Sequence, residues 1–212
     1  AGAALAAVRD ATPGSRAFVL VRPPGHHAMR EGYDVSAGGC GFCVLGNAAV
    51  AAAEALTAEE TRVAVVDFDV HHGNGTVDIF KDDPRVLVCS SYQDPLYPNR
   101  YFDLEKSNII NTPLVEGTRS QQFRSAISDS WLPAIESHQP DLIFISAGFD
   151  AHELDPLAQI NLSKDDFTWI TNEIVTLANA HCEGRIVSAL EGGYHLKALA
   201  ESAQCHIESL CE

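Results

Sequence analysis

The stretch of sequence that decides the fold covers residues 63–75 and reads Val-Ala-Val-Val-Asp-Phe-Asp-Val-His-His-Gly-Asn-Gly. It opens with four apolar residues and then changes to carboxylates, imidazoles and glycines. A continuous apolar run of this kind is typical of a strand that is buried on both faces, as in a parallel sheet. The segment therefore predicts a buried strand that delivers polar side chains at its carboxyl end.

Further apolar runs alternate along the chain with stretches that have a helical pattern. The runs that we predict as strands cover residues 17–21, 63–66, 86–89, 142–145 and 186–190, with a weaker one at 108–112. The stretches that we predict as helices cover residues 43–57, 120–138, 163–181 and 196–211. This alternation indicates a mostly parallel sheet with helices on both faces. We therefore predict a single α/β domain over residues 1–212.

The composition excludes several classes of protein. The 212 residues carry a formal net charge of −15. Such a chain repels the phosphates of nucleic acids, so we expect no nucleic-acid partner, and its charge favours cationic substrates only weakly. No apolar run approaches the roughly 20 residues that span a membrane, so we expect no membrane partner. The six cysteines are scattered along the chain, which favours reduced thiols and a cytoplasmic location.

Polar side chains follow the predicted strands, at the point where each strand ends. In open α/β sheets, ligands bind outside the carboxyl ends of the strands. Five separate placements at this edge predict a functional site. The residues concerned are His26 and His27, then Asp67, Asp69, His71 and His72, then Ser90 and Ser91, then Asp150, and last Tyr194.

The segment after the strand at 63–66 predicts a metal site. Residues two apart on an extended strand share a face, so we expect Asp67, Asp69 and His71 to project together. Asp150 is the best candidate for a further ligand. Three ligands of these types suit zinc and leave it an open position, as in catalytic sites. The alternative is that the carboxylates and imidazoles cap the following helix.

Three further features lie at the same predicted edge. The turn at residues 23–25 presents His26 and His27 for proton transfer, since imidazole titrates near neutrality. Tyr194 follows two glycines and is placed to polarise a carbonyl group. Residues 40–43 form a Cys-Gly-Phe-Cys motif, which fits either small buried residues in a glycine-rich turn or a redox dithiol.

Five motifs in this chain resemble those of the zinc-dependent histone deacetylase family. The resemblance is to its class II-like branch, which includes bacterial deacetylase-like amidohydrolases and acetylpolyamine amidohydrolases. The motifs occur in the order of the family between residues 22 and 196. They are Arg-Pro-Pro-Gly-His-His-Ala at 22–28, Gly-Phe-Cys at 41–43, Asp-Phe-Asp-Val-His-His-Gly-Asn-Gly-Thr at 67–76, Ser-Ala-Gly-Phe-Asp-Ala at 146–151 and Glu-Gly-Gly-Tyr at 191–194.

The resemblance implies a role for each of these residues. It implies zinc ligation by Asp69, His71 and Asp150; proton handling by His26 and His27, held by Asp67 and Asn74; donation to the scissile carbonyl by Tyr194; and a substrate channel lined by Gly41, Phe42, Tyr97 and Leu157. It also implies a structural potassium ion held by Asp67, Asp69, His71, Ser90 and Ser91, partly through backbone oxygens. A charged partner stabilises imidazolium more than a neutral one, so we expect His27, beside Asn74, to be the proton shuttle.

The resemblance implies a zinc-dependent amidohydrolase that removes an acetyl or other acyl group from an N-acylated amine. The amine would be acetyl-lysine in a protein or an acetylpolyamine, attacked by metal-activated water, and a homo-oligomer is compatible with the resemblance. The alternatives are a non-catalytic module that binds acyl-lysine or acyl-amine and, third, a two-manganese ureohydrolase. Family members carry about 100 residues before the histidine turn, within ordinary domain size. This chain supplies 25 before His26, so we expect an N-terminally short domain.

Overall fold

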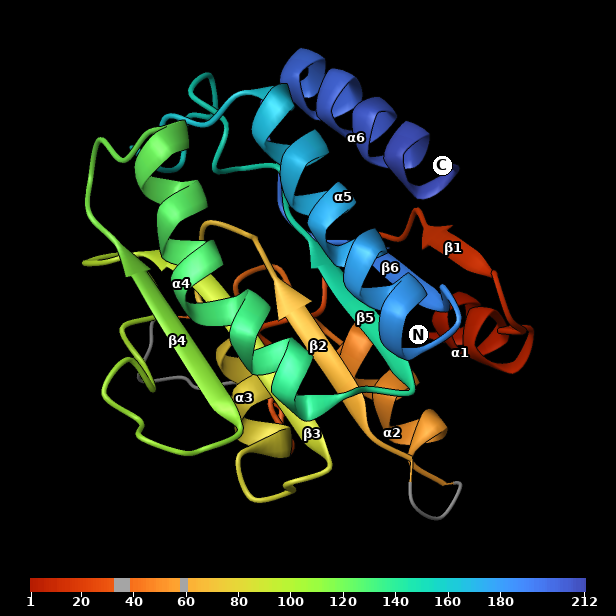
Figure 1. Ribbon diagram of the computed structural model, residues 1–212. Helices are drawn as coiled ribbons and strands as arrows, with labels where there is room; N and C mark the ends of the chain where they lie inside the picture. The colour runs from red at the N-terminus through yellow and green to blue at the C-terminus, as the bar shows by residue number, and fades with distance from the viewer. Residues whose placement is uncertain (33–38, 58–60) are drawn as a thin grey trace.

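A parallel sheet of six strands forms the centre of the protein, and helices cover both of its faces (Figure 1). The computed structural model describes residues 1–32, 39–57 and 61–212. Within them the strand order is β1-β6-β5-β2-β3-β4, and every neighbouring pair is parallel. The strands are β1 (Arg16–Val19), β2 (Val63–Asp67), β3 (Val86–Gln93), β4 (Ile109–Leu114), β5 (Leu142–Ala147) and β6 (Ile186–Leu190).

Two hydrophobic clusters separate the sheet from the helices on its two faces. Ala64 and Val66 of β2 face the cluster that packs under α4 and α5, whereas Val63 and Val65 face the cluster that packs on α2 and α3. None of the helices in the described ranges is long and apolar enough to cross a membrane. The helices are α1 (Gly2–Arg9), α2 (Asn47–Ala55), α3 (Asn74–Phe80), α4 (Ser120–His138), α5 (Lys164–His181) and α6 (Leu196–Leu210).

The predicted elements are confirmed, with differences at their ends. Strand β1 ends at Val19, so Leu20 and Val21 lie outside it. Helix α2 begins at Asn47 because residues 40–43 are taken up by a turn that the glycines permit. Helices α1 and α3 were not predicted from the sequence. Each is only two turns long, and α3 contains a glycine, so neither has a pattern that stands out from a loop.

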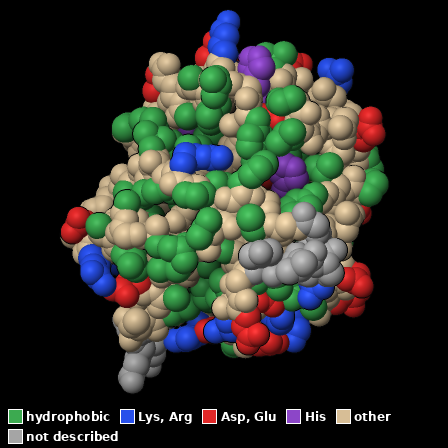
Figure 2. All heavy atoms as spheres, turned by 180° about the vertical axis from the view of Figure 1, so that it is seen from behind, with side chains coloured by type: hydrophobic (Ala, Val, Ile, Leu, Met, Phe, Trp, Pro, Cys, Tyr) green, Lys and Arg blue, Asp and Glu red, His purple; other side chains and the backbone are tan. Residues whose placement is uncertain are grey.

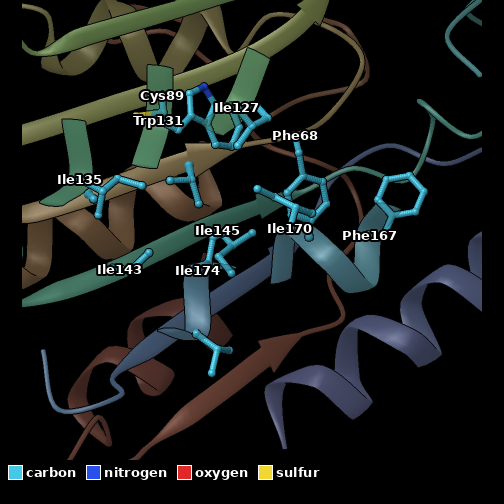
Figure 3. Close-up of a cluster of buried hydrophobic side chains, with 14 of the residues drawn as sticks. Phe68, Cys89, Ile127, Trp131, Ile135, Ile143, Ile145, Phe167, Ile170 and Ile174 are labelled. Carbon is cyan, nitrogen blue, oxygen red and sulfur yellow. The ribbon is translucent and has the colours of Figure 1, made fainter. Parts of the chain in front are cut away.

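The larger of the two hydrophobic clusters lies between the sheet and helices α4 and α5. The side chains of Phe123, Ile127, Trp131 and Ile135 repeat every four residues, so they form one apolar stripe, and all four are buried. The indole Nε1 of Trp131 also donates to Oγ1 of Thr112 at 3.1 Å. Figure 3 shows Trp131 and Ile127 directed toward the strands, close to Cys89 of β3. The stripe anchors α4 on the sheet.

Replacing Trp131 by alanine is expected to lower the free energy of unfolding by about 3–5 kcal/mol, because a fully buried aromatic side chain is lost and a cavity remains. Denaturant unfolding monitored by circular dichroism measures the change. The matched control is Trp169→Ala, since Trp169 is only half-buried beneath the Arg124 guanidinium. Equal losses for the two variants would contradict this account of the core.

Candidate active site

Three predicted metal ligands meet at the carboxyl edge of the sheet. Nδ1 of His71 lies 3.1 Å from Oδ1 of Asp69 and 3.1 Å from Oδ2 of Asp150. The ligand atoms of all three residues lie within 4.8 Å of one another. Strand β5 pairs with β2, so the loop that follows β5 brings Asp150 beside the segment that follows β2. One imidazole nitrogen and two carboxylate oxygens thus face a common point.

Backbone N–H groups hold the two carboxylates in place. Gly192 donates to Oδ2 of Asp69 at 2.7 Å, and Val70 donates to Oδ1 of Asp150 at 2.9 Å. A side chain at position 192 would overlap both carboxylates, so the close approach of this backbone requires glycine. These hydrogen bonds occupy Oδ2 of Asp69 and Oδ1 of Asp150. The other oxygen of each carboxylate therefore faces His71. This donor set fits a zinc ion with an open position for substrate or water.

The charges of the three ligands are strongly coupled. Burial and the negative charge of Asp69 raise the pKa of Asp150 to about 6. Burial disfavours the charged form of His71, but hydrogen bonds to Asp150 and Asp69 outweigh it and raise its pKa to about 10. Two carboxylates buried side by side need a positive partner, because an uncompensated buried charge is very costly. A protonated His71 or a bound cation supplies it.

The structure corrects one part of the sequence-based account of residues 67–71. Strand β2 ends at Asp67, so Asp69 and His71 converge from a loop and do not lie on an extended strand. Asp67 is directed instead at His26, with its Oδ2 2.9 Å from Nδ1 of that imidazole. The alternative that these residues cap the next helix is wrong, since α3 has Gly73 at its N-cap and no side-chain cap.

The tandem histidines have different partners. Nδ1 of His27 lies 2.6 Å from Oδ1 of Asn74, and the two imidazole rings are 4.0 Å apart at their centroids. Burial disfavours charge on His26, yet the negative charges of Asp69 and Asp67 raise its pKa well above the usual value. Burial and the neighbouring charge of His26 lower the pKa of His27 well below its usual value. The two pKa shifts have the directions expected for His26 beside the charged Asp67 and for His27 beside the neutral Asn74.

A fully buried carboxylate, Glu191, joins the loop of the tandem histidines to the sheet. Its Oε2 accepts N–H groups from Gly25 at 2.6 Å and from His26 at 3.1 Å, and Oε1 accepts the Ser146 hydroxyl at 3.2 Å. Burial raises the pKa of Glu191 to about 7. Glu191 belongs to the motif at residues 191–194, but the sequence analysis predicted no role for it. The available signal was an acidic residue that directly follows a buried strand.

Aromatic side chains stand around the predicted substrate channel. The Phe42 ring is 61% exposed and lies 5.9 Å from the ring of Tyr194. The Tyr97 ring meets His27 edge-on at 5.0 Å. Gly41 packs so closely on the His27 imidazole that a side chain there would overlap it. Leu157 is also predicted to line the channel and is 42% exposed. Figure 2 shows surface histidine side chains among apolar ones on one face of the molecule.

The cysteine motif forms a turn in which the N–H of Cys43 donates to the carbonyl of Cys40 at 2.8 Å. None of the six cysteines is in a disulfide. Cys43 is buried, and burial raises the pKa of its thiol to about 12, which makes this thiol a poor nucleophile. The geometry favours the interpretation as small residues in a glycine-rich turn.

The predicted potassium ligands lie at the end of β2, in the segment after it, and within β3. Strand β3 runs from Val86 to Gln93, so Ser90 and Ser91 belong to the strand and do not follow it as predicted. Asp67 and Ser90 are direct neighbours in the ladder, and the Ser90 hydroxyl accepts the N–H of Gly73 at 3.2 Å. Successive side chains of a strand point to opposite faces, so the hydroxyls of Ser90 and Ser91 cannot both face Asp67. A potassium ion here stays a prediction, and Ser91 would contribute its backbone oxygen.

Comparison with known proteins identifies similar sequences and structures. A family model described as the histone deacetylase domain matches residues 1–210. Histone deacetylase 14 of Arabidopsis thaliana, a chloroplastic protein, is 40% identical over 205 residues, which are 93% of this chain and 47% of that protein. The histone deacetylase-like amidohydrolase of Pseudomonas aeruginosa is 39% identical over 205 residues, covering 92% and 52%. The chain thus spans about half the length of these relatives.

Solved structures agree with these matches. The HDA15 HD domain superposes with a TM-score of 0.86 at 33% identity, covering 98% of this chain and 61% of that one. The acetylpolyamine aminohydrolase from Burkholderia pseudomallei superposes with a TM-score of 0.83 at 34% identity, covering 98% and 59%. The similarity therefore extends over nearly the whole fold described above.

Reconstitution with Zn²⁺ is expected to give one zinc ion per chain and to raise the thermal unfolding midpoint, since a ligand bound only by the folded state stabilises it. Asp69→Asn is expected to weaken zinc binding by more than about 100-fold, because even outer-shell changes cost about 10- to 100-fold. Metal content by mass spectrometry and the unfolding midpoint are the measurements. The exposed Asp129→Asn is the matched control, and equal zinc retention by all three proteins would refute the metal site.

Proposed function

Because the chain belongs to the histone deacetylase family, we propose that it is a zinc-dependent amidohydrolase that removes an acetyl or other acyl group from an N-acylated amine. The observation that supports this most directly is the convergence of Asp69, His71 and Asp150 beside the tandem histidines. A zinc ion held by these three ligands would polarise the scissile carbonyl and acidify a water molecule.

The two imidazoles have different roles. Nδ1 of His27 faces the acceptor Oδ1 of Asn74, which leaves the lone pair of Nε2 available. Since the pKa of His27 is lowered by burial, this nitrogen can take a proton from the attacking water and pass it to the amine. His26 stays protonated beside Asp67 and stabilises negative charge that develops on the substrate.

Tyr194 supplies the second interaction with the carbonyl oxygen. Burial and the nearby charges of Asp69 and Asp150 raise the pKa of its phenol, so the hydroxyl stays protonated in any ordinary buffer. A phenol that keeps its proton can donate a hydrogen bond to the negative charge that develops on the carbonyl oxygen. Phe42, 5.9 Å from the Tyr194 ring, would flank the acyl-amine stem as it enters.

The proposed substrate is an acyl group carried on an otherwise cationic amine, either a lysine side chain or a polyamine. The relatives are named for both substrate classes, as histone deacetylases and as an acetylpolyamine aminohydrolase. The net charge of −15 favours both kinds of amine. The assembled proton-transfer pairs support an enzyme over the alternative of a binding module, which has no use for them.

Replacing Tyr194 by phenylalanine is expected to lower kcat by about 100-fold or more, because a donor to the oxyanion is lost. The assay uses zinc-loaded protein with an acetyl-lysine peptide and, separately, an N-acetylpolyamine. Tyr101→Phe is the matched control, since its hydroxyl donates to Asp78 away from the metal ligands.

The outcomes separate the two functions. Turnover by the wild type that Tyr194→Phe removes while binding persists supports the hydrolase. Tight binding of either acylated amine by zinc-loaded wild type without any turnover would establish the binding module instead.

A further inference from the structure

We propose that Asp155 is a positioning residue, which holds Tyr194 and Leu157 in register through their backbone N–H groups. The proposal rests on the function proposed above. Asp155 lies in the loop after β5, whereas Tyr194 lies in the loop between β6 and α6. Its side chain is not a predicted metal ligand and touches no reacting atom, so it would act only through the two residues that it holds.

Three backbone donors converge on the Asp155 carboxylate. Oδ2 accepts the N–H of Tyr194 at 2.7 Å and the N–H of His195 at 3.3 Å. Oδ1 accepts the N–H of Leu157 at 3.1 Å. The residue is only 8% exposed, so these hydrogen bonds are largely shielded from water. Each oxygen is therefore committed to a different segment of the site.

The loop that carries Tyr194 is held upstream at Gly192, whose N–H donates to Asp69 at 2.7 Å and whose carbonyl accepts the N–H of Phe149 at 3.0 Å. Asp155 holds the next stretch of the loop, at Tyr194. Gly192 and Gly193 precede it, and Gly193 has φ +130°, a conformation open to glycine but rarely to other residues. The chain then enters α6 at His195, the N-cap, whose N–H is one of the donors to Asp155. A carboxylate at a helix N-terminus is favoured by the helix dipole. Asp155 thus holds the segment between Gly193 and the start of α6.

The same carboxylate also fixes Leu157. Its hydrogen bond to the Leu157 N–H closes a turn of the kind that aspartate makes with the backbone two residues on, and Pro156 stiffens it further. Leu157 is a predicted channel residue, and Tyr194 is the proposed donor to the carbonyl. One carboxylate would therefore set the spacing between the channel wall and the catalytic phenol.

The chemistry of an amide makes Asp155→Asn a sharp test. An asparagine has one acceptor oxygen and one NH₂ group, so in either orientation an NH₂ group meets a backbone N–H. The hydrogen bond to Tyr194 or the one to Leu157 must therefore break, although the side chain keeps its size and shape. The matched control is Asp166→Asn, because Asp166 is likewise a buried carboxylate and accepts the N–H of Ser163 at the start of α5. That carboxylate stabilises the fold without contacting the site.

The experiment measures amide hydrogen exchange in residues 190–196 and steady-state turnover of the zinc-loaded protein. Asp155→Asn is expected to speed exchange in this segment and to lower kcat by about 10- to 100-fold, as small misplacements of catalytic groups do. Zinc content and KM should change little. Asp166→Asn is expected to lower the unfolding midpoint and to leave both the exchange of this segment and kcat per folded molecule unchanged.

A double-mutant cycle decides whether Asp155 acts through Tyr194. In a Tyr194→Phe background, Asp155→Asn should lower kcat by less than a further factor of about two, because the hydroxyl that Asp155 positions is already absent. The proposal would be overturned if Asp155→Asn left amide exchange in residues 190–196 unchanged. It would also be overturned if the double mutant lost kcat by the full factor that Asp155→Asn costs alone. If Asp155→Asn does not fold, Asp155→Glu replaces it, because the extra methylene group displaces both acceptor oxygens and should change exchange and kcat in the same directions. Absence of wild-type turnover would count against the proposed hydrolase alone, since the exchange measurement still decides the role of Asp155.

Discussion

The buried negative charge of Asp69 and Asp150 is the constraint on which the rest of the site depends. The two carboxylates share one imidazole nitrogen, at 3.1 Å each, and both are buried away from bulk solvent. A cation must occupy such a place, as a proton or as a metal ion. The N–H groups that point at the carboxylates, and the glycine that lets one of them approach, follow from this requirement.

Much of the fold and many of the site residues could be predicted from the sequence, because both follow from short-range patterns. The run at 63–66 is apolar on both faces, as a central strand must be, and it lies in the middle of the sheet. Asp150 was found because it follows such a run closely. Its pairing with His71 depends on β5 lying next to β2, and strand order is a property of the whole sheet. Its predicted place at the carboxyl edge made Asp150 the best candidate for a third ligand, and the resemblance implied the same role.

Other features could not be predicted because they depend on backbone atoms from distant loops. Nothing in the residues around Glu191 or Asp155 shows that N–H groups from residues 25 and 194 will converge on them. Any residue except proline presents the same donor, so side-chain patterns carry no trace of these bonds. Helix α3 was not predicted for a different reason. Its seven residues make only two turns and include Gly75, so they have no helical pattern that stands out from a loop.

The position of β1 has a consequence for the handling of the protein. It is an edge strand that pairs only with β6 among the described residues, and Leu20 just beyond it is 67% exposed. Open edges of this kind recruit strands from other molecules, which is a common start of aggregation. The net charge of −15 opposes such encounters by mutual repulsion. The tendency to aggregate should therefore increase with ionic strength, because added salt screens the repulsion between molecules and allows their β1 edges to meet.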